Sequence, residues 1–168
     1  MTRIEVRAAA LTDLPRLHPV IERAYRGDSA RQGWTHEADM LSDARTDLDT
    51  LATLIDGDSR LLIALDGDTM LGCVNVASRD NGLAYLGLLC VDPDIQARGI
   101  GKQLIAAAEA TARDTFAATR IEMTVIDRRV ELIAWYERHG YTRSGETRPF
   151  PVPLDSPLTM TVLVKSLL

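Results

Sequence analysis

The chain has 168 residues, enough for one domain with a hydrophobic core, and residues 1–168 are expected to form a single domain. Hydrophobic residues make up 46% of the chain and charged residues 26%, which excludes a mainly disordered protein. The net charge of −5 and the lack of any run of Lys and Arg argue against a nucleic-acid partner.

The N-terminus and the cysteines bear on the cellular compartment. The first residues, MTRIEVRAA, contain no apolar segment of the kind found in signal peptides, and no stretch reaches the roughly 18 apolar residues that a membrane span needs. Cys73 and Cys90 form neither a disulfide framework nor a metal-ligand cluster, so no metal site is expected. We therefore expect a cytoplasmic protein without a membrane partner.

The first part of the chain predicts a strand followed by helices. Residues 3–7 alternate polar and apolar side chains, which is typical of a half-buried strand. Thr12 is expected to cap a helix that runs to about Tyr25, and Pro19 should kink or break that helix. A second helical region begins most clearly at Thr46.

From residue 60 onward the pattern changes to that of strands. Asp66-Gly67 lies between two apolar segments and predicts a hairpin, and Asn81-Gly82 marks a second turn. We expect an α/β fold, with a mixed and mostly antiparallel central sheet flanked by helices. The expected strands cover residues 61–65, 70–77, 83–91, 120–126, 141–146 and 158–165, and the expected helices cover residues 100–115 and 127–139. Strands 83–91 and 120–126 should be the parallel pair.

The most informative segment is Gln96-Ala97-Arg98-Gly99-Ile100-Gly101-Lys102, which connects strand 83–91 to the next helix. Backbone N–H groups at a helix start are unpaired and the helix dipole adds positive character, which together suit a pyrophosphate. The two glycines leave the backbone open to close approach, and the basic residues add charge. Two glycines alone would more often mark an ordinary helix start. The position after an apolar strand favours the anion site.

This segment, within VDPDIQARGIGKQL, resembles motif A of the GNAT acyltransferase superfamily, Q/R-x-x-G-x-G/A after an apolar strand, through Gln96, Gly99 and Gly101. WYERHGY, from Trp135 to Tyr141, resembles the second signature of the family, an aromatic-Tyr-x-x-x-Gly-aromatic stretch. The expected element order matches the GNAT fold along nearly the whole chain. The resemblance implies an acetyl-CoA-dependent N-acetyltransferase, with acetyl-CoA as cosubstrate, and a splayed parallel strand pair.

The resemblance also implies where the cosubstrate lies. The pantetheine arm would pair with backbone groups of the splayed strand, and a backbone N–H there would polarise the acyl carbonyl. Arg129 stands where the family often has an Asn that contacts CoA. Arg128 or Arg129 meets the CoA phosphates, or both are solvated. The expected cofactor-binding residues are Leu89, Cys90, Val91, Gln96, Ala97, Arg98, Gly99, Ile100, Gly101, Lys102 and Arg129.

Tyr136 is the expected catalytic residue. Attack of an amine on a thioester expels a thiolate, to which a nearby tyrosine hydroxyl can give a proton. From the residues alone, Tyr136 fits better as a packing residue beside Leu132 and Ile133 at helical spacing, whereas the resemblance favours the acid role. A covalent acyl-cysteine at Cys90 is disfavoured because the sequence shows no activating base for it.

The general base and the acceptor stay open. His36, Glu37, Glu146 and an ordered water are the alternatives for removing a proton from the amine. The acceptor is expected to be a small-molecule or peptide amine that attacks directly in a ternary complex, and family analogy suggests a homodimer. The alternative function is a noncatalytic acyl-CoA-binding regulatory module. The chain lacks G-x-x-x-x-G-K-[ST], which argues against nucleoside triphosphate binding of the Walker type.

Overall fold

The computed structural model describes residues 4–25, 46–95, 99–149 and 159–168. The helices and strands follow in chain order as β1 (Ile4–Ala8), the 3-10 turn η1 (Leu11–Asp13), α1 (Leu14–Tyr25), α2 (Leu48–Ala52), β2 (Ser59–Asp66), β3 (Thr69–Ser78), the 3-10 turn η3 (Asp80–Gly82), β4 (Leu83–Val91), α3 (Ile100–Asp114), β5 (Arg120–Ile126), α4 (Val130–Arg138), β6 (Thr142–Pro149) and β7 (Thr159–Ser166). The strands expected from residue 60 onward are present, with bounds that differ by at most three residues.

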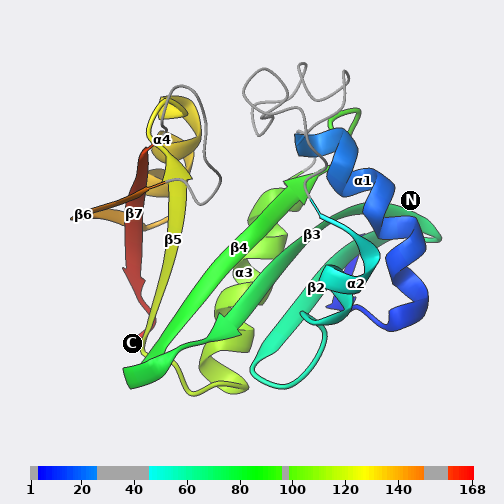
Figure 1. Cartoon of the computed structure of the whole chain (residues 1–168), viewed down its shortest axis with the longest axis horizontal. Coiled ribbons are helices and arrows are strands. Elements are labelled where there is room, and N and C mark those ends of the chain that lie inside the picture. The colour runs from blue at the N-terminus through cyan, green and yellow to red at the C-terminus, as the bar shows by residue number, and fades with distance from the viewer. Residues whose placement is uncertain (1–3, 26–45, 96–98, 150–158) are drawn as a thin grey trace.

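The strands form one seven-stranded sheet in the order β1-β2-β3-β4-β5-β7-β6. Every neighbouring pair is antiparallel except β4 and β5, which run parallel. Helices cover both faces of the sheet: α1 and α2 pack on one side and α3 on the other (Figure 1). The expected fold class, a mixed and mostly antiparallel α/β sheet with one parallel pair, is confirmed.

The two parallel strands separate soon after they start. They are paired only from Leu83 opposite Arg120 to Tyr85 opposite Glu122. Beyond these residues β4 continues along β3, whereas β5 continues along β7, and the two ribbons diverge toward their carboxyl ends (Figure 1). The splayed pair expected from the family resemblance is therefore present. We call the space between the backbones of β4 and β5 beyond Tyr85 the wedge.

A buried ion pair connects α3 to β7 across the sheet. Glu109 on α3 is 8% exposed and accepts hydrogen bonds from Lys165 Nζ at 3.0 and 3.1 Å and from the Tyr141 hydroxyl at 3.0 Å. Lys165 Nζ also donates to the carbonyl of His139 at 3.0 Å. Three hydrogen bonds from two partners offset the cost of burying the charge of Glu109, and they tie the end of α4 to both elements.

Of the kink or break expected at Pro19, the break is absent. α1 continues through Pro19 to Tyr25 and buries Leu17 and Ile21 completely. Proline removes one N–H and so leaves one carbonyl of the preceding turn without a backbone partner. Pro19 lies on the exposed side of α1, where water can satisfy that carbonyl, and burial of the apolar face outweighs the loss.

The residues that begin the helices also differ from those expected. Asp13, not Thr12, organises the start of the first helical region: its carboxylate accepts from the backbone N–H of Ala10 at 2.7 Å. The second helix is capped by Asp47, whose carboxylate accepts from Thr50 N at 2.7 Å. Asp127 does not cap α4, because the helix begins later, with Arg129 at its N-cap, and the Asp127 carboxylate accepts a hydrogen bond from the Thr161 hydroxyl. In each case the capping residue depends on where the chain turns into the helix. A capping pattern in the sequence locates that turn only to within one or two residues.

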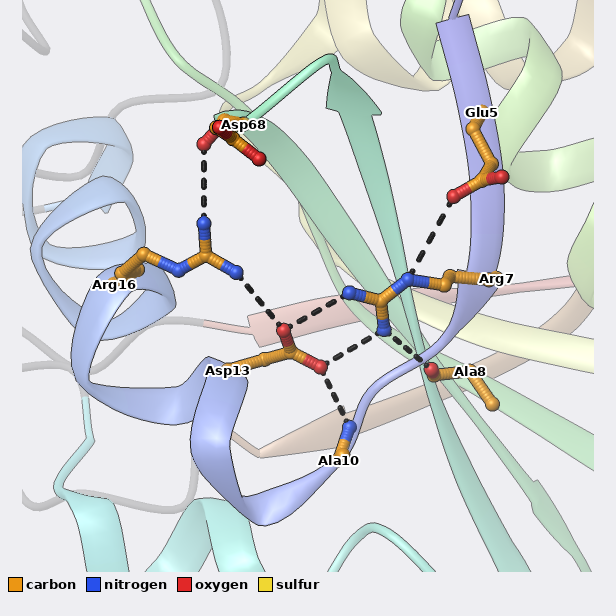
Figure 2. Close-up of polar contacts among 7 residues, drawn as sticks. All are labelled: Glu5, Arg7, Ala8, Ala10, Asp13, Arg16 and Asp68. Carbon is orange, nitrogen blue, oxygen red and sulfur yellow. Dashed lines mark hydrogen bonds and ion pairs between the residues drawn. The ribbon is translucent and has the colours of Figure 1, made fainter.

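Asp13 is the centre of an ion-pair cluster that holds β1 against α1 (Figure 2). Arg7 donates to both carboxylate oxygens of Asp13, at 2.9 and 3.0 Å, and Arg16 donates to one of them at 3.1 Å. Arg16 also reaches the carbonyl of Asp68 at 3.1 Å. The hydrogen bond from Arg7 is the largest cause that lowers the pKa of Asp13 far below its usual range. Asp13 is therefore a buried carboxylate that the fold keeps charged.

Candidate active site

Strand β4 carries an irregularity inside the wedge. Cys90 faces Cys73 and Gly87 faces Asn75, so β4 has two residues between these pairs where β3 has only one. Leu88, one of those two residues, has φ of 53°, a value in the left-handed region that branched side chains rarely adopt. Such a bulge turns the backbone of Leu88 to Val91 out of regular register, next to the point where β5 leaves β4.

Side chains from neighbouring elements hold the bulge in place. The hydroxyl of Tyr25, at the end of α1, donates to the carbonyl of Leu89, and the thiol of Cys73 donates to the carbonyl of Leu88 at 3.4 Å. On β3, a Cβ at Gly72 would lie 2.2 Å from the carbonyl oxygen of Cys90, so only glycine fits there. The carbonyl of Leu89, one of the three residues expected to contact the pantetheine arm, is thus already bonded to the protein.

The start of α3 has the features of an anion site on a helix of 15 residues. Gly99 precedes it with φ of 72°, a conformation that favours glycine, and no acidic residue lies in the first turn. The first backbone bond of the helix runs from Gln103 N to the Gly99 carbonyl at 3.1 Å, so the N–H groups of residues 100–102 lie before it. Lys102 is exposed and Ile100 is buried. Gln96, Ala97 and Arg98 lie outside the described residues.

The connection between the bulge and α3 is anchored on α1. The Asp92 carboxylate accepts from Arg23 Nη2 at 2.7 Å and from Asp94 N at 3.1 Å, and Asp92 N donates to the Leu71 carbonyl at 2.7 Å. Asp92 is only 8% exposed. Neither Arg23 nor Asp92 is among the residues that the sequence predicts at the site. An acidic residue at the end of an apolar strand was the available signal, but its basic partner lies 69 residues away.

Gly101 faces the second signature of the family. A Cβ at Gly101 would lie 3.4 Å from two indole carbons of Trp135 on α4 and 3.9 Å from a Val91 methyl carbon. The small residue at this position therefore lets the indole pack on the first turn of α3. We expected Gly101 only to leave room for phosphates, and the structure adds this packing contact between the two sequence motifs.

Tyr136 lies in the core next to the wedge. It is 5% exposed, and its ring packs edge to face with those of Trp135 and Tyr141, with centroids 5.2 and 6.0 Å apart. Burial raises the pKa of the Tyr136 hydroxyl, and Tyr85 contributes in the same direction, whereas Arg129 lowers it. The hydroxyl makes no hydrogen bond to any residue in the described part of the chain. Its raised pKa keeps the hydroxyl neutral, and Tyr85 and the half-buried Arg129 both affect its ionisation.

A hydrogen bond crosses from β4 to β5 at the narrow end of the wedge. The Tyr85 hydroxyl and the Thr124 hydroxyl lie 2.7 Å apart, although Tyr85 is paired in the sheet with Glu122, two residues earlier on β5. A Cβ on Gly87 would lie 3.3 Å from Cε1 of Tyr85, so the ring leans along β4 over Gly87. Neither Tyr85 nor Thr124 was a predicted site residue, because their contact depends on a register that the sequence does not reveal.

Of the candidate bases, only Glu146 lies in the described residues; His36 and Glu37 do not. Glu146 is exposed on β6, where Arg148 Nε donates to its carboxylate at 2.8 Å. That hydrogen bond is the main cause that lowers the pKa of Glu146. Arg148 also bonds Glu122 on β5 at 2.8 and 3.3 Å. A carboxylate so paired is a weak base, which counts against Glu146.

The same described ranges contain neither a metal-ligand cluster nor a membrane-spanning helix. No group of three or more His, Cys, Asp or Glu side chains in them is placed to hold a metal ion. None of the helices in them combines the length and apolar character needed to cross a membrane.

The chain is similar to known proteins over its sequence and its fold. The family model described as Acetyltransferase (GNAT) family matches residues 19–141. S-(2-succino)cysteine N-acetyltransferase of Bacillus subtilis (strain 168) is 39% identical over 66 residues, which cover 39% of this chain and only 40% of that enzyme.

Solved structures share the fold over nearly the full length. The ribosomal-protein-S18-alanine N-acetyltransferase from Escherichia coli matches with a TM-score of 0.76 at 17% identity, covering 98% of this chain and 94% of its own. The structure of yncA from Salmonella typhimurium with its cofactor acetyl-CoA matches with a TM-score of 0.73 at 17% identity, over 98% and 94% of the two chains. At these identities the structures establish the fold. Because the family model spans most of the sequence, the family and the enzyme class expected from the two motifs are confirmed: this chain belongs to the acetyltransferase (GNAT) family.

Proposed function

We propose that the protein transfers the acetyl group of acetyl-CoA to a primary amine by direct attack within a ternary complex. The observation that carries this proposal is the wedge, which opens toward the glycine-led start of α3. One feature offers backbone groups to an extended ligand and the other offers N–H groups to its phosphates. The family to which the chain belongs supports the same assignment.

The residues at the site fit an acyl-CoA. The first turn of α3 has N–H groups that lie before its first helical hydrogen bond among the described residues, no acidic side chain and an exposed lysine, all of which suit a pyrophosphate. The bulged part of β4 lies beyond its pairing with β5, so that it can take an extended arm as an added strand. The proposed cosubstrate contacts are Leu89, Cys90 and Val91 for the arm, Gln96 to Lys102 for the pyrophosphate, and Arg129 as a further contact to CoA.

Acetyl-CoA supplies a thioester carbonyl and a thiol leaving group. As the amine nitrogen bonds to the carbonyl carbon, the carbon–sulfur bond breaks, the amine loses a proton to a base or water, and the sulfur takes a proton from Tyr136. Tyr136 then recovers its proton from solvent. Burial keeps this hydroxyl neutral before the reaction, which is the state a proton donor needs. A backbone N–H in the bulge would polarise the carbonyl.

The similar proteins support an acceptor that is acetylated on nitrogen. The similar proteins include one named for S-(2-succino)cysteine and one named for an alanine of a ribosomal protein, both of which are acetylated on nitrogen. We propose a small-molecule or peptide amine as the acceptor. The single domain over residues 1–168, the cytoplasmic location and the homodimer stay predictions.

A melting series tests the cosubstrate. CoA and acetyl-CoA should raise the melting temperature, whereas ATP and NAD at equal concentration should not, because a ligand selective for the folded state stabilises it by about 2.7 kcal/mol at 100 times its Kd. Equal shifts with all four ligands, or none with CoA, would refute the assignment. Release of free thiol from acetyl-CoA with a panel of primary amines then tests catalysis. CoA binding without turnover for any amine would favour the noncatalytic acyl-CoA-binding module.

A further inference from the structure

At the narrow end of the wedge, side chains connect β4 and β5 beyond their last backbone pair. Sheet pairing between β4 and β5 ends at Tyr85 and Glu122, and the Tyr85 ring then leans over Gly87 toward the bulge. Its hydroxyl meets that of Thr124 at 2.7 Å, so one side chain from each strand spans the gap between them. On the outer side, the guanidinium of Arg79 lies 5.2 Å from the centre of the Tyr85 ring. The ring is therefore held from two sides.

In an acyl-CoA the phosphates, the pantetheine arm and the acyl group follow one another, so under the proposed function the position of the phosphates sets the direction of the arm. The start of α3, which is to hold the phosphates, follows the carboxyl end of β4 and lies at the wide end of the wedge. The arm must then run back along β4, from Val91 toward the bulge at Leu88. The acyl group is the last part of the molecule and points toward Gly87 and Tyr85.

We propose that Tyr85 and Thr124 limit the length of the acyl group that the enzyme accepts. This inference rests on the proposed function. The Tyr85 ring covers Gly87, the residue next to the bulge, so a longer acyl chain would meet the ring and the hydrogen bond behind it. To pass, it would have to break the bond and leave two hydroxyls without partners beside an apolar chain, which is unfavourable. An acetyl group is short enough to stop before the ring.

The proposal gives Tyr85 a role distinct from that of Tyr136. Tyr136 belongs to the core cluster formed with α3 and α4, whereas Tyr85 crosses from β4 to β5 through its hydrogen bond with Thr124. Tyr136 is placed to give a proton to the sulfur, whereas Tyr85 meets only the far end of the acyl group. Tyr85 is thus a specificity residue, and substitutions at Tyr85 should change the relative affinities for short and long acyl-CoA donors.

The test is the affinity for a series of donors, measured by calorimetric titration, which needs no acceptor. Free CoA, acetyl-CoA, butyryl-CoA and hexanoyl-CoA are titrated into the wild type, Tyr85→Ala, Thr124→Val and Thr142→Val. Thr142 is an exposed β6 residue whose hydroxyl donates to the Val164 carbonyl, so its variant is the matched control for loss of a threonine hydroxyl.

We expect the wild type to bind hexanoyl-CoA at least about 10-fold more weakly than acetyl-CoA, since a blocked pocket commonly discriminates by 10-fold or more. Tyr85→Ala should remove most of this discrimination, Thr124→Val part of it, and Thr142→Val none, while free CoA binds all four proteins alike. If Tyr85→Ala binds free CoA normally but keeps the wild-type ratio of acetyl-CoA to hexanoyl-CoA affinity, the inference is overturned and the proposed function is not. No CoA binding by the folded wild type would overturn the proposed function, and the inference with it.

Discussion

At the scale of single residues, the site combines groups that the sequence motifs contain with groups that only the fold brings in. Tyr136 comes from the second motif, and its burial gives the hydroxyl the neutral state that proton donation requires. Tyr25 and Tyr85 come from elsewhere in the chain, and each forms a hydrogen bond at the wedge through its hydroxyl. We propose a different role for each of the three phenols, and hydroxyl deletions can separate these roles.

Tyr136→Phe should lower kcat and kcat/KM together and leave the affinity for CoA nearly unchanged. The ring and its packing remain, and the lost interaction is one made only as the thiolate departs. General acids commonly contribute about 10²–10⁴-fold, and we expect the low end because a thiolate leaves readily. Steady-state kinetics and calorimetry measure both quantities. Wild-type kcat under conditions where chemistry limits the rate would make Tyr136 a packing residue only.

Gly101→Val should destabilise the fold as well as weaken cosubstrate binding. A branched side chain there would collide with the Trp135 indole, which lies 3.4 Å from the Cβ position. Overpacking of this kind typically costs about 1–3 kcal/mol. Gly101→Ala, whose single carbon is in normal contact, is the control and should melt close to the wild type. Denaturant unfolding with tryptophan fluorescence measures both variants. Equal stability of the Val and Ala variants would contradict the packing role.

At the scale of elements, the pairing of strands follows from the sequence better than the ends of helices do. The Asp66-Gly67 hairpin and the strand before α3 were predictable because turn residues and apolar runs are local signals. The helix through Pro19 was not, because the exposure of the proline depends on which face of α1 meets the sheet. The same holds for the site: the glycines of motif A are visible in the sequence, whereas the Tyr85–Thr124 contact requires the register of β4 with β5.

The cluster that joins β1 to α1 should make stability depend on pH. The folded pKa of Asp13 lies below its unfolded value of about 3.9, so its contribution is complete above that pH and is lost as the pH falls toward the folded pKa. Asp13→Asn should cost about 1.5–3 kcal/mol at pH 7, since it removes charge-assisted hydrogen bonds from Arg7 and Arg16. The difference between variant and wild type should shrink below about pH 4. Denaturant midpoints from pH 2.5 to 7 measure it, and a constant difference would exclude the charge as the cause.

At the scale of the whole molecule, the proposed direct transfer requires both substrates to be bound at once. Direct transfer predicts that initial-rate lines for acetyl-CoA and amine intersect and that Cys90→Ala remains active. Cys90 is fully buried, with its sulfur 3.6 Å from that of Cys73, and neither is in a disulfide. Parallel lines together with an acylated Cys90 in the mass spectrum would instead show a covalent intermediate.

The wedge also has a consequence for how the molecule opens in the absence of substrates. Within the sheet, the part formed by β5, β7 and β6 is joined to the part formed by β1 to β4 only through the three residue pairs that begin at Leu83 and Arg120. The two parts are also connected by the Tyr85–Thr124 hydrogen bond and by the hydrophobic core that both form with α3, to which Lys165 of β7 is bonded through Glu109. We expect the short strand pairing, a seam in the sheet, to let one part of the sheet open before the other. We expect amide protons of β5 and β7 to exchange through a subglobal opening that leaves β2 and β3 protected. Acetyl-CoA, lying across the seam, should slow that exchange, and the enzyme would then become one cooperative unit only when its cosubstrate is bound.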